Sequence, residues 1–357
     1  MRSRILPLFY FLTALLLSLS LLSGCLAMPE YPSSAPTPTA SADASADADW
    51  GFELHFLDVG QADCMLVRCG DAAMLVDGGN VDDGSLVYSY LEQEGLEYLD
   101  YVVCTHAHED HCGGLSAALS YADAGTIYAP VTEYDTKAFS DVVRYAEAQG
   151  NFITVPEPDT VFSLGEAEVT VLAPRYEYED TNNTSIVLRI EYGETSFLLT
   201  GDAETLSEND ILDAGCDVES TVLKIGHHGS SSSTSYRWLD AVMPEYAVIQ
   251  VGTDNSYGHP HDEVMSRLMD AEIPVYRTDE MGTVICFSDG ETVTFVTGRS
   301  VLPATSVPEA QYIGNVNSKK FHLPDCSGLP EEHNRILFFS RTDAVEAGYS
   351  PCGNCYP

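Results

Sequence analysis

From Gly51 onward, short runs of alternating apolar and polar residues are separated by stretches in which apolar residues recur every three or four positions. Strict alternation predicts half-buried strands, and the longer spacing predicts amphipathic helices. In the first half of the chain, three strands are followed by alternating helices and strands, with Gly- and Asp-rich turns between them. The predicted strands lie within 52–60, 64–70, 72–80, 102–105 and 126–131, and the predicted helices within 85–96, 113–122 and 141–150.

The second half of the chain repeats this style. It contains two strand pairs, then helices alternating with single strands, and it closes with a hairpin whose Asp289-Gly290 pair is a turn signal. Two β-rich halves that each carry helices predict an α/β fold, in which two sheets pack face to face with helices outside. The segments are 160–174 and 185–204 for the strand pairs, 204–214 for a helix, 219–230 and 244–252 for single strands, 263–276 for a helix and a strand, and 282–298 for the hairpin.

The N-terminus has the pattern of a targeting segment. Arg2 and Arg4 precede an apolar run over 5–22, and LSGC follows, ending at Cys25. This pattern resembles a bacterial lipobox, which implies cleavage before Cys25, lipidation of that cysteine and a tether to the membrane. An uncleaved transmembrane anchor is the alternative, because the run is near spanning length. Residues 1–25 are therefore predicted to be a lipoprotein signal peptide, and the protein is expected on the extracellular face of the membrane.

Two low-complexity segments divide the rest of the chain. Residues 26–50 are rich in Pro, Ser, Ala and Asp and cannot bury a core, so they are predicted to be a flexible linker. A second linker is predicted at 299–311. The main body would then occupy 51–298, and a small unit would occupy 312–357, with too little apolar material to fold on a core alone.

The chain is strongly acidic, with 16 Lys+Arg, 55 Asp+Glu and a formal net charge of −39. Such a surface keeps a protein soluble and repels polyanions. It argues against electrostatic capture of nucleic acid, which normally requires basic patches.

Metal-ligating residue types gather in THAHEDHCGG, residues 105–114, and after later apolar strands. Imidazole and carboxylate together suit zinc, manganese or iron, and loops at strand ends are where sites assemble. Of the adjacent His227 and His228, we expect one to be a ligand and favour His228; Glu109 is expected to be a spacer, and Asp58 and Asp77 to orient imidazoles. The candidate ligands are His106, His108, Asp110, His111, Asp202, His227, His228 and His259.

HAHEDHCGG resembles the HxHxDH signature of the metallo-β-lactamase superfamily. FLDVGQADCMLV, LVDGG, TGDA, KIGHHGS and YGHPHDEV are similar to the branch that contains the extracellular domain of the ComEC/Rec2 DNA-uptake proteins. The resemblance covers residues 52–297 and implies a four-layered αβ/βα sandwich with a binuclear site for two divalent ions, zinc or manganese. Where the superfamily often has a further histidine, this chain has Asn182 and Asn183, which leaves the coordination of one ion open. The ligands that the resemblance implies are His106, His108, Asp110, His111, the bridging Asp202 and His228, with His259 nearby as ligand or proton donor.

The C-terminal unit carries its own metal-binding pattern. Cys352 and Cys355 form a PCGNC knuckle, and His322 and Cys326 supply a second half. Together they predict one structural zinc ion that folds the segment, with a disulfide as the alternative. NSKKFH, NRILFFSRTDAVEAGY and PCGNC make the stretch similar to the metal-binding domain of Ada-type DNA repair proteins, which hints at contact with DNA.

These patterns favour a tethered metal-dependent hydrolase. Its expected substrate is DNA or a related phosphodiester, with Asp110 as proton acceptor from water and His259 as proton donor. Lys224, Arg237 and the Ser230–Ser233 loop are candidates for substrate contact. The alternatives are a cell-envelope choline-phosphate or teichoate esterase, and a non-catalytic surface protein that binds DNA or serves adhesion.

Overall fold

The structure is a computed structural model, and it describes residues 51–298, 312–324, 326–330, 334–338, 341–352 and 355. The predicted signal peptide at 1–25 with its lipidated Cys25, and the linkers at 26–50 and 299–311, lie outside the described residues. Among the residues that are described, no helix has both the length and the apolar character needed to cross a membrane.

The first sheet of the body has eight strands in the order β15-β14-β1-β2-β3-β4-β5-β6. The N-terminal strands run antiparallel, whereas β3 to β6 are parallel to one another. The strands are β1 (Phe52–Phe56), β2 (Met65–Cys69), β3 (Ala72–Val76), β4 (Tyr98–Val103), β5 (Asp123–Tyr128), β6 (Ile153–Thr154), β14 (Thr283–Ser288) and β15 (Val293–Gly298).

The second sheet has seven strands in the order β13-β12-β11-β10-β9-β8-β7. Here β7 to β10 are antiparallel, and β10 to β13 are parallel. The strands are β7 (Val161–Leu164), β8 (Ala167–Ala173), β9 (Val187–Tyr192), β10 (Thr195–Leu199), β11 (Val222–Lys224), β12 (Tyr246–Ile249) and β13 (Val275–Arg277).

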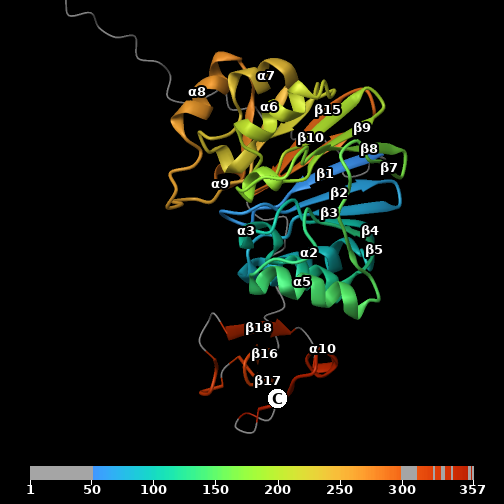
Figure 1. Cartoon of the computed structure of the whole chain (residues 1–357), viewed down its shortest axis with the longest axis vertical. Coiled ribbons are helices and arrows are strands. Elements are labelled where there is room, and N and C mark those ends of the chain that lie inside the picture. Colours follow the sequence, from blue (N-terminus) through green and yellow to red (C-terminus); the bar gives the residue numbers. More distant parts are fainter. Residues whose placement is uncertain are drawn as a thin grey trace, which may run out of the picture. The chain divides into compact units, whose positions relative to one another are not determined.

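Helices cover the outer face of each sheet, as Figure 1 shows for α2 and α5 on one side and for α6, α7 and α8 on the other. The helices are α2 (Gly84–Glu94), α3 (Glu109–Cys112), α4 (Leu115–Tyr121), α5 (Lys137–Ala148), α6 (Thr205–Asp213), α7 (Tyr236–Val242), α8 (Asp262–Asp270) and α9 (Thr278–Met281), with short 3-10 turns η1 (Val81–Asp83), η2 (Asn182–Thr184) and η3 (Gly226–Gly229).

Three apolar cores match these layers. One lies between the two sheets, where the rings of Phe52 and Phe197 stack with centroids 4.5 Å apart. The second fills the space beneath the helices of the first sheet, and the third fills the space beneath those of the second. The predicted four-layered sandwich is therefore confirmed, because each sheet buries one face on the other sheet and one face on helices.

The parallel strands of both sheets end near the same place. The loop after β4 carries His106 to His111, the loop after β10 carries Asp202, and the turn after β11 carries His227 and His228. Carboxyl ends of parallel strands gather at one edge of a sheet, so four separate chain segments converge there, including the loop with His259 after β12.

The C-terminal unit has a four-stranded sheet in the order β18-β16-β17-β19. Its elements are β16 (Tyr312–Asn315), β17 (Lys320–His322), β18 (Arg335–Phe338), α10 (Arg341–Glu346) and β19 (Ser350–Pro351). Its apolar core is small and consists of Phe321, Ile336, Phe338, Ala344 and Tyr349, with a few partly buried neighbours.

Candidate metal centre

The histidine loop after β4 is fixed from below by Asp77. This fully buried carboxylate accepts hydrogen bonds from the backbone N–H and the hydroxyl of Thr105, both at 2.7 Å, and from His111 Nδ1 at 2.9 Å. Because Nδ1 of His111 donates to Asp77, its Nε2 faces the other way, toward Asp202. Asp77 thus orients an imidazole, as its position in LVDGG predicted.

Asp202 stands at the centre of the site and is almost completely buried. Its Oδ1 lies 3.3 Å from His111 Nε2 and 3.8 Å from His228 Nε2. Its Oδ2 lies 4.0 Å from His106 Nε2 and 3.7 Å from His227 Nε2. The two oxygens of one carboxylate therefore face two different pairs of imidazoles.

The close approach of Asp202 to the histidine loop depends on the preceding glycine. Gly201 has φ of +51°, and a Cβ there would lie 2.9 Å from the Thr105 side chain. A larger residue would meet both the backbone restriction and this contact. The TGDA sequence therefore brings Asp202 as near to the loop as the chain permits.

His228 is held from two sides. Its Nδ1 lies 3.0 Å from the carbonyl oxygen of Gln250 and 3.3 Å from Asp63 Oδ1. Its Nε2 lies 3.4 Å from Asp110 Oδ2. The side-chain amide of Gln250 also donates to the carbonyl oxygens of Leu57 and Cys64, both at 2.9 Å, and so ties the two sheets together under the site.

The donor atoms at the centre fit a divalent cation. His111 Nε2, His228 Nε2 and Asp202 Oδ1 are buried without a hydrogen-bond partner, whereas buried polar atoms are normally bonded. Ligand atoms of Asp110, His111, Asp202 and His228 all lie within 4.8 Å of one another. A cation among them would satisfy all of these atoms at once, and the set of imidazole and carboxylate donors suits zinc or manganese.

The electrostatics of the centre also favour positive charge. Burial opposes protonation of His228, but the carboxylates of Asp202 and Asp63 outweigh burial and raise the pKa of His228 to about 10. Burial likewise opposes protonation of His111, and Asp202 and Asp77 raise its pKa well above the usual value. For Asp202, the two imidazoles overcome the effect of burial and hold the pKa well below the usual range. The negative charge of these carboxylates, which favours protonation of the imidazoles, also attracts a metal cation.

His106 and His108 form the other side of the centre. Nε2 of His106 lies 3.0 Å from Nδ1 of His108, and Nδ1 of His106 is near the hydroxyls of Thr105 and Ser185, at 3.2 and 3.4 Å. Burial and the neighbouring His111 keep the pKa of His106 well below its usual value, so its imidazole is neutral. Neutral imidazole is the form that binds metal.

Comparison with known proteins agrees with this geometry. Residues 57–252, more than half of the chain, match the family model of the metallo-beta-lactamase superfamily. The chain belongs to this superfamily. Within it, the chain belongs to the ComEC/Rec2-like branch, as its curated relatives indicate.

The curated relatives include three proteins from different bacteria. ComE operon protein 3 of Bacillus subtilis is 30% identical over 65% of this chain and 32% of its own length. Competence protein ComA of Neisseria gonorrhoeae is 33% identical over 64% and 31%, and Recombination protein 2 of Haemophilus influenzae is 30% identical over 65% and 28%. The chain therefore spans about a third of the length of these relatives.

A cavity of about 380 Å³ opens over the metallo-beta-lactamase centre. No Lys or Arg is among its lining residues, so any anion there would depend on the metal ions for positive charge. Glu109, expected to be a spacer, is exposed at the rim of the cavity. The lining residues are Gln61, His108, Glu109, Asp110, Asn182, Asp202, His227, His228, Tyr257 and His259.

His259 forms one wall of this cavity, and its hydrogen bonds fix its tautomer. The amide oxygen of Gln61 accepts from the N–H of Gly252 at 3.1 Å, so the amide nitrogen is the group that faces His259 Nδ1, at 3.3 Å. Nδ1 is therefore an acceptor, and Nε2 carries the proton. Burial and the neighbouring His227 lower the pKa of His259 to about 4, which leaves this imidazole neutral at pH 7.

Three sequence-based expectations about the surroundings of the centre are wrong. Lys224 does not face the cavity: it is fully buried, with its Nζ 2.8 Å from Asp63 Oδ2. Arg237 is engaged by Asn209 and Asp213 of α6, at 2.6 Å each. Asp58 does not orient a histidine, since its Oδ1 bonds the N–H of Gly60 at 3.4 Å.

Asp63 takes the role that had been expected of Asp58. Both residues belong to the LDVGQAD stretch, but Asp63 lies two residues before the strand β2 and is fully buried beside His228. Spacing in the sequence alone does not show which of these two carboxylates contacts a histidine. Pairing Asp63 with the Lys in the otherwise apolar TVLKIG strand would have found it, because a buried lysine requires a buried carboxylate partner.

The serine loop after η3 is structural. The hydroxyl of Ser233 donates to the carbonyl oxygen of Gly226 at 2.7 Å, and the hydroxyl of Ser232 lies 3.2 Å from His227 Nδ1 and 2.9 Å from Ser230 Oγ. These hydroxyls hold His227 and the turn that begins at Gly226 in place. They do not offer a row of free donors to a substrate.

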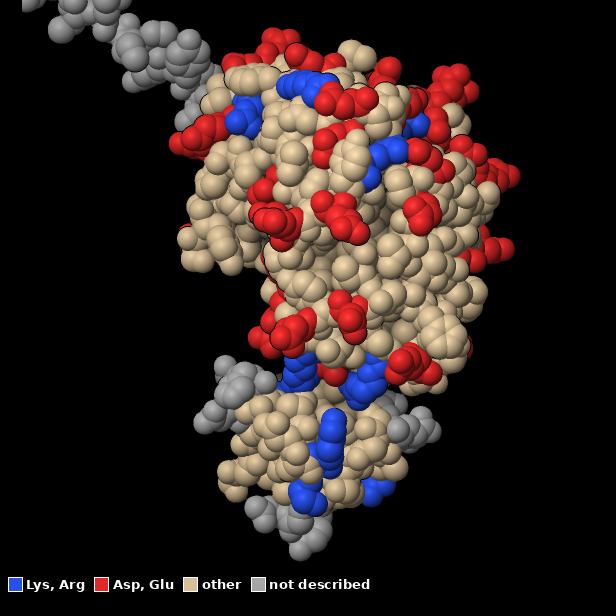
Figure 2. All heavy atoms as spheres, in the orientation of Figure 1, with Lys and Arg blue, Asp and Glu red and all other residues tan. Residues whose placement is uncertain are grey.

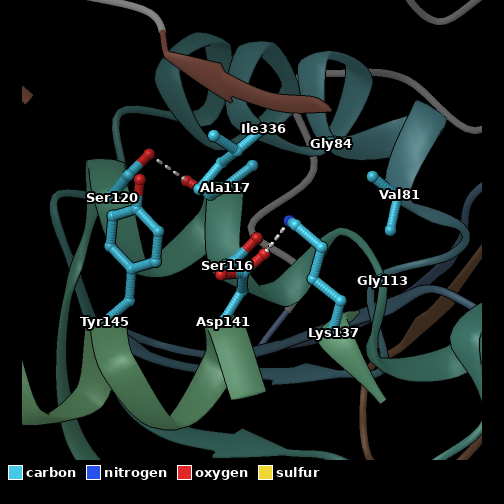
Figure 3. Close-up of a pocket in the computed structure, with 10 residues that line it drawn as sticks. All are labelled: Val81, Gly84, Gly113, Ser116, Ala117, Ser120, Lys137, Asp141, Tyr145 and Ile336. Carbon is cyan, nitrogen blue, oxygen red and sulfur yellow. Dashed lines mark hydrogen bonds and ion pairs between the residues drawn. The ribbon is translucent and has the colours of Figure 1, made fainter. Parts of the chain in front are cut away.

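A separate pocket near α4 and α5 has little capacity for a ligand. Its volume is about 30 Å³, which leaves room for only a few water molecules. Lys137 and Asp141 are joined there by an ion pair at 2.5 Å, as Figure 3 shows. Because this cation is already neutralised, the pocket provides no anion site.

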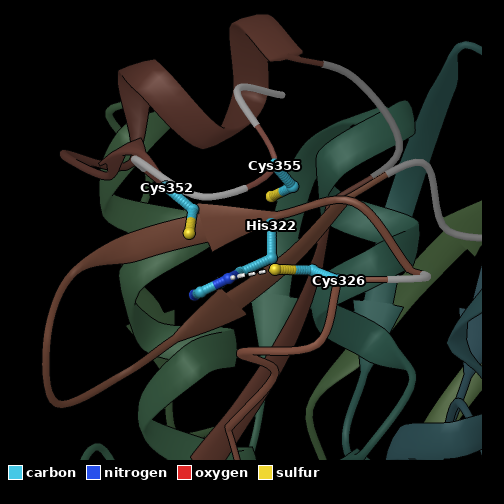
Figure 4. A group of neighbouring side chains, drawn as sticks. All are labelled: His322, Cys326, Cys352 and Cys355. Atoms are coloured by element: carbon cyan, nitrogen blue, oxygen red, sulfur yellow. Dashed lines mark hydrogen bonds between the residues drawn. The ribbon is translucent and has the colours of Figure 1, made fainter.

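The C-terminal unit assembles a second group of donors, shown in Figure 4. Donor atoms of His322, Cys326, Cys352 and Cys355 lie within 4.8 Å of one another. Backbone N–H groups of Leu323 and Gly328 point at the sulfur atoms of Cys355 and Cys326, each at 3.4 Å. None of the described cysteines forms a disulfide. Three sulfurs and one imidazole match the donor set of closed structural zinc sites.

Proposed function

We propose that the protein is a metal-dependent phosphodiesterase that acts on DNA or a related phosphodiester. The observation that carries the proposal is the position of Asp202, whose two oxygens face separate pairs of imidazoles. A carboxylate in this position can bridge two divalent ions. Paired ions of this kind make water nucleophilic near neutral pH and offset charge on a phosphoryl oxygen.

The side chains of the site would hold the metal ions and contact the water and the leaving oxygen. His106, His108, Asp110, His111, Asp202 and His228 would hold the zinc or manganese ions, in agreement with the donor set described above. Asp110 contacts His228 and lines the cavity, so it could accept a proton there. His259 presents an N–H at Nε2, which can donate a hydrogen bond to a leaving oxygen and stabilise the negative charge that develops there.

The names of the relatives support a nucleic-acid substrate. Two of them are a competence protein and a recombination protein, although each is about three times longer than the matched region. A substrate phosphodiester carries one negative charge per linkage, and two divalent ions can neutralise that charge without a basic groove.

A small phosphodiester of the cell envelope is the second candidate, namely a choline-phosphate ester or a teichoate. The absence of Lys and Arg from the cavity lining favours it, as does the acidic surface of the body in Figure 2. A compact substrate would meet only the cavity, whereas a long polyanion would also meet this acidic surface.

The two candidates can be separated with the purified full chain. It would be incubated with Mn²⁺ or Zn²⁺ and offered single-stranded DNA, double-stranded DNA, a phosphocholine ester and a teichoate. We expect DNA cleavage that His108→Ala abolishes. Intact DNA together with cleavage of a small ester would favour the second candidate, and no cleavage of any phosphodiester would contradict the proposal.

For the C-terminal unit we propose one structural zinc ion, held by His322, Cys326, Cys352 and Cys355, in an Ada-like fold. The proposal includes contact with DNA through the basic residues of this unit, which Figure 2 shows in blue. Two of those cations also pack on aromatic rings: Lys319 on Tyr349 at 4.6 Å and Arg341 on Phe321 at 5.9 Å.

We further propose that Cys25 carries a lipid that tethers the protein to the extracellular face of the cell membrane. The proposal rests on the lipobox pattern that ends at Cys25. Cys25→Ser is expected to move the protein from the membrane fraction to the soluble fraction. Retention of the variant in the membrane fraction would contradict a lipid tether.

A further inference from the structure

On the Oδ2 side of Asp202, away from His111, the set of candidate metal ligands is incomplete. His106 and His108 face this side, but no histidine occurs between His111 and His227 to complete the set. The imidazole that stands beside Asp202 Oδ2, in addition to His106, is that of His227, with its Nε2 at 3.7 Å. This is slightly closer than His106 Nε2, at 4.0 Å.

The far nitrogen of His227 is held as in a metal-bound histidine. Its Nδ1 lies 3.2 Å from the hydroxyl of Ser232 and 3.4 Å from Glu204 Oε1. Glu204 is in turn held by the side-chain amide of Asn183, at 3.3 Å. Histidines that bind metal usually give their other nitrogen to a carboxylate or a similar acceptor, which fixes the ring and the tautomer. Nε2 of His227 is then left as the free donor atom.

The backbone places His227 and His228 on different sides of the same carboxylate. Both residues have left-handed φ, +50° and +51°. This conformation is uncommon for residues other than glycine and persists only where the surrounding structure imposes it. The N–H of His227 bonds the carbonyl oxygen of Gly201 at 3.1 Å, next to Asp202, which fixes the turn against the carboxylate.

His259 is less suited to this position. Its Nδ1 accepts a hydrogen bond from Gln61, so its Nε2 bears the proton and has no free lone pair for a metal. His228 is engaged on the Oδ1 side, with Asp110. Among the other histidines that line the cavity, His227 is therefore the one that can join His108 on the Oδ2 side.

We propose that His227 is a metal ligand, and that it completes the set of His106, His108 and Asp202 on the Oδ2 side of the centre. His228 serves the Oδ1 side with Asp110 and His111, so the adjacent histidines are divided between two ions. The inference rests on the two-ion site of the proposed function. It makes both residues of the HH pair ligands, where the sequence favoured only one.

The test is the metal content of the full chain, measured by native mass spectrometry and by chelator competition. His227→Asn is the informative variant, because asparagine tolerates left-handed backbone but replaces the imidazole with a poor ligand. We expect it to lose one ion and to bind that ion about 100-fold more weakly. His227→Asp, which offers a carboxylate in the same backbone conformation, should restore much of the binding.

His261→Asn is the matched control, since His261 bonds the N–H of Ser231 and lies outside the cavity lining. It should retain all ions. Unchanged metal content and affinity in His227→Asn would overturn the inference, as would a wild-type body that holds a single ion. A wild type that holds both ions but cleaves no phosphodiester would contradict the proposed function alone, because ion counting does not depend on turnover.

Discussion

At the scale of single residues, the ion pair of Lys224 and Asp63 supports the centre from below. Both side chains are fully buried, and Lys224 also donates to the carbonyl oxygen of Ile225 at 2.9 Å. Burial opposes charge on Asp63, but Lys224 and then His228 hold its pKa below the usual value. The pair therefore keeps a carboxylate charged beside His228, in a place where a lone charge would not persist.

Lys224→Met should be strongly destabilising. It leaves Asp63 buried without its cation, a change that typically costs about 3–5 kcal/mol. Urea unfolding would measure this loss in the free energy of unfolding. Arg237→Met is the matched control, because the Arg237–Asp213 pair is largely exposed and should contribute less than about 1 kcal/mol. Equal losses of stability from the two substitutions would show that the buried ion pair stabilises the protein no more than the exposed pair does.

His259→Ala should affect substrates according to their leaving groups. If the Nε2 N–H of His259 donates a hydrogen bond to the leaving oxygen, turnover of DNA, with a strongly basic alkoxide leaving group, should fall about 100-fold or more. Turnover of bis(p-nitrophenyl) phosphate should fall much less, because p-nitrophenolate leaves without a proton. Metal content should not change. An equal loss on both substrates would contradict a role of His259 in stabilising the leaving oxygen.

At the scale of elements, the sequence predicted most strands and helices but missed α7. The stretch before it, Ser230 to Ser235, looks like a polar loop, yet Ser235 caps the helix by accepting from the N–H of Trp238. Trp238 then buries its ring against the second sheet. Capping and packing together form this short helix, and neither is visible in a hydrophobic pattern that covers only two turns.

Glu208 of α6 also anchors the start of α7. It is almost completely buried and accepts from the N–H groups of Thr234 and Ser235, the latter at 3.1 Å. Glu208→Ala leaves the buried N–H of Thr234 and the partly buried N–H of Ser235 without partners, which should cost about 2–4 kcal/mol. Urea unfolding would give the loss, and hydrogen exchange should show it first in α7. A loss below about 0.5 kcal/mol would mean that water replaces the carboxylate.

Removal of zinc should unfold the C-terminal unit selectively. Its apolar core is too small to support it alone, so metal binding should supply much of its folding free energy. Cys352→Ser, or a strong chelator, should remove the protection of residues 312–352 from hydrogen exchange and leave β1 to β15 protected. Cys216→Ser is the control, since Cys216 lies in the body. A unit that stays protected without metal would contradict the structural zinc.

At the scale of the whole molecule, the net charge of −39 should give DNA cleavage an unusual salt dependence. Proteins that bind DNA through basic surfaces lose affinity as salt rises. Here the long-range force is repulsive, and salt screens it over about 8 Å at 0.15 M. The KM for DNA should fall several-fold between about 10 and 150 mM salt, whereas the KM for a small phosphodiester should change little. A KM for DNA that rises with salt would point to capture by a basic surface.

The sequence predicted which loops carry the donors, because each follows an apolar strand and such loops converge in an α/β sandwich. It could not predict how the donors divide around Asp202, since that depends on side-chain orientation across both sheets. The apolar TVLKIG strand does indicate that Lys224 is buried, but its partner Asp63 lies far away in the chain, so the pair is found only by joining the two segments. The local pattern of the sequence predicts the helices and strands. The division of the metal ligands around Asp202 instead depends on packing between residues that lie far apart in the chain.

The pairing of β1 with β14 has a consequence for the order of events during synthesis. Phe52 lies opposite Ser288, so the first strand meets this neighbour only when nearly the whole body has left the ribosome. Until then β1 presents an open edge, the kind that recruits strands from other chains. A chain that stalls or is cut before β14 would keep this edge permanently. We therefore expect truncated chains to aggregate through the open edge of β1, before any loss of catalytic rate can matter.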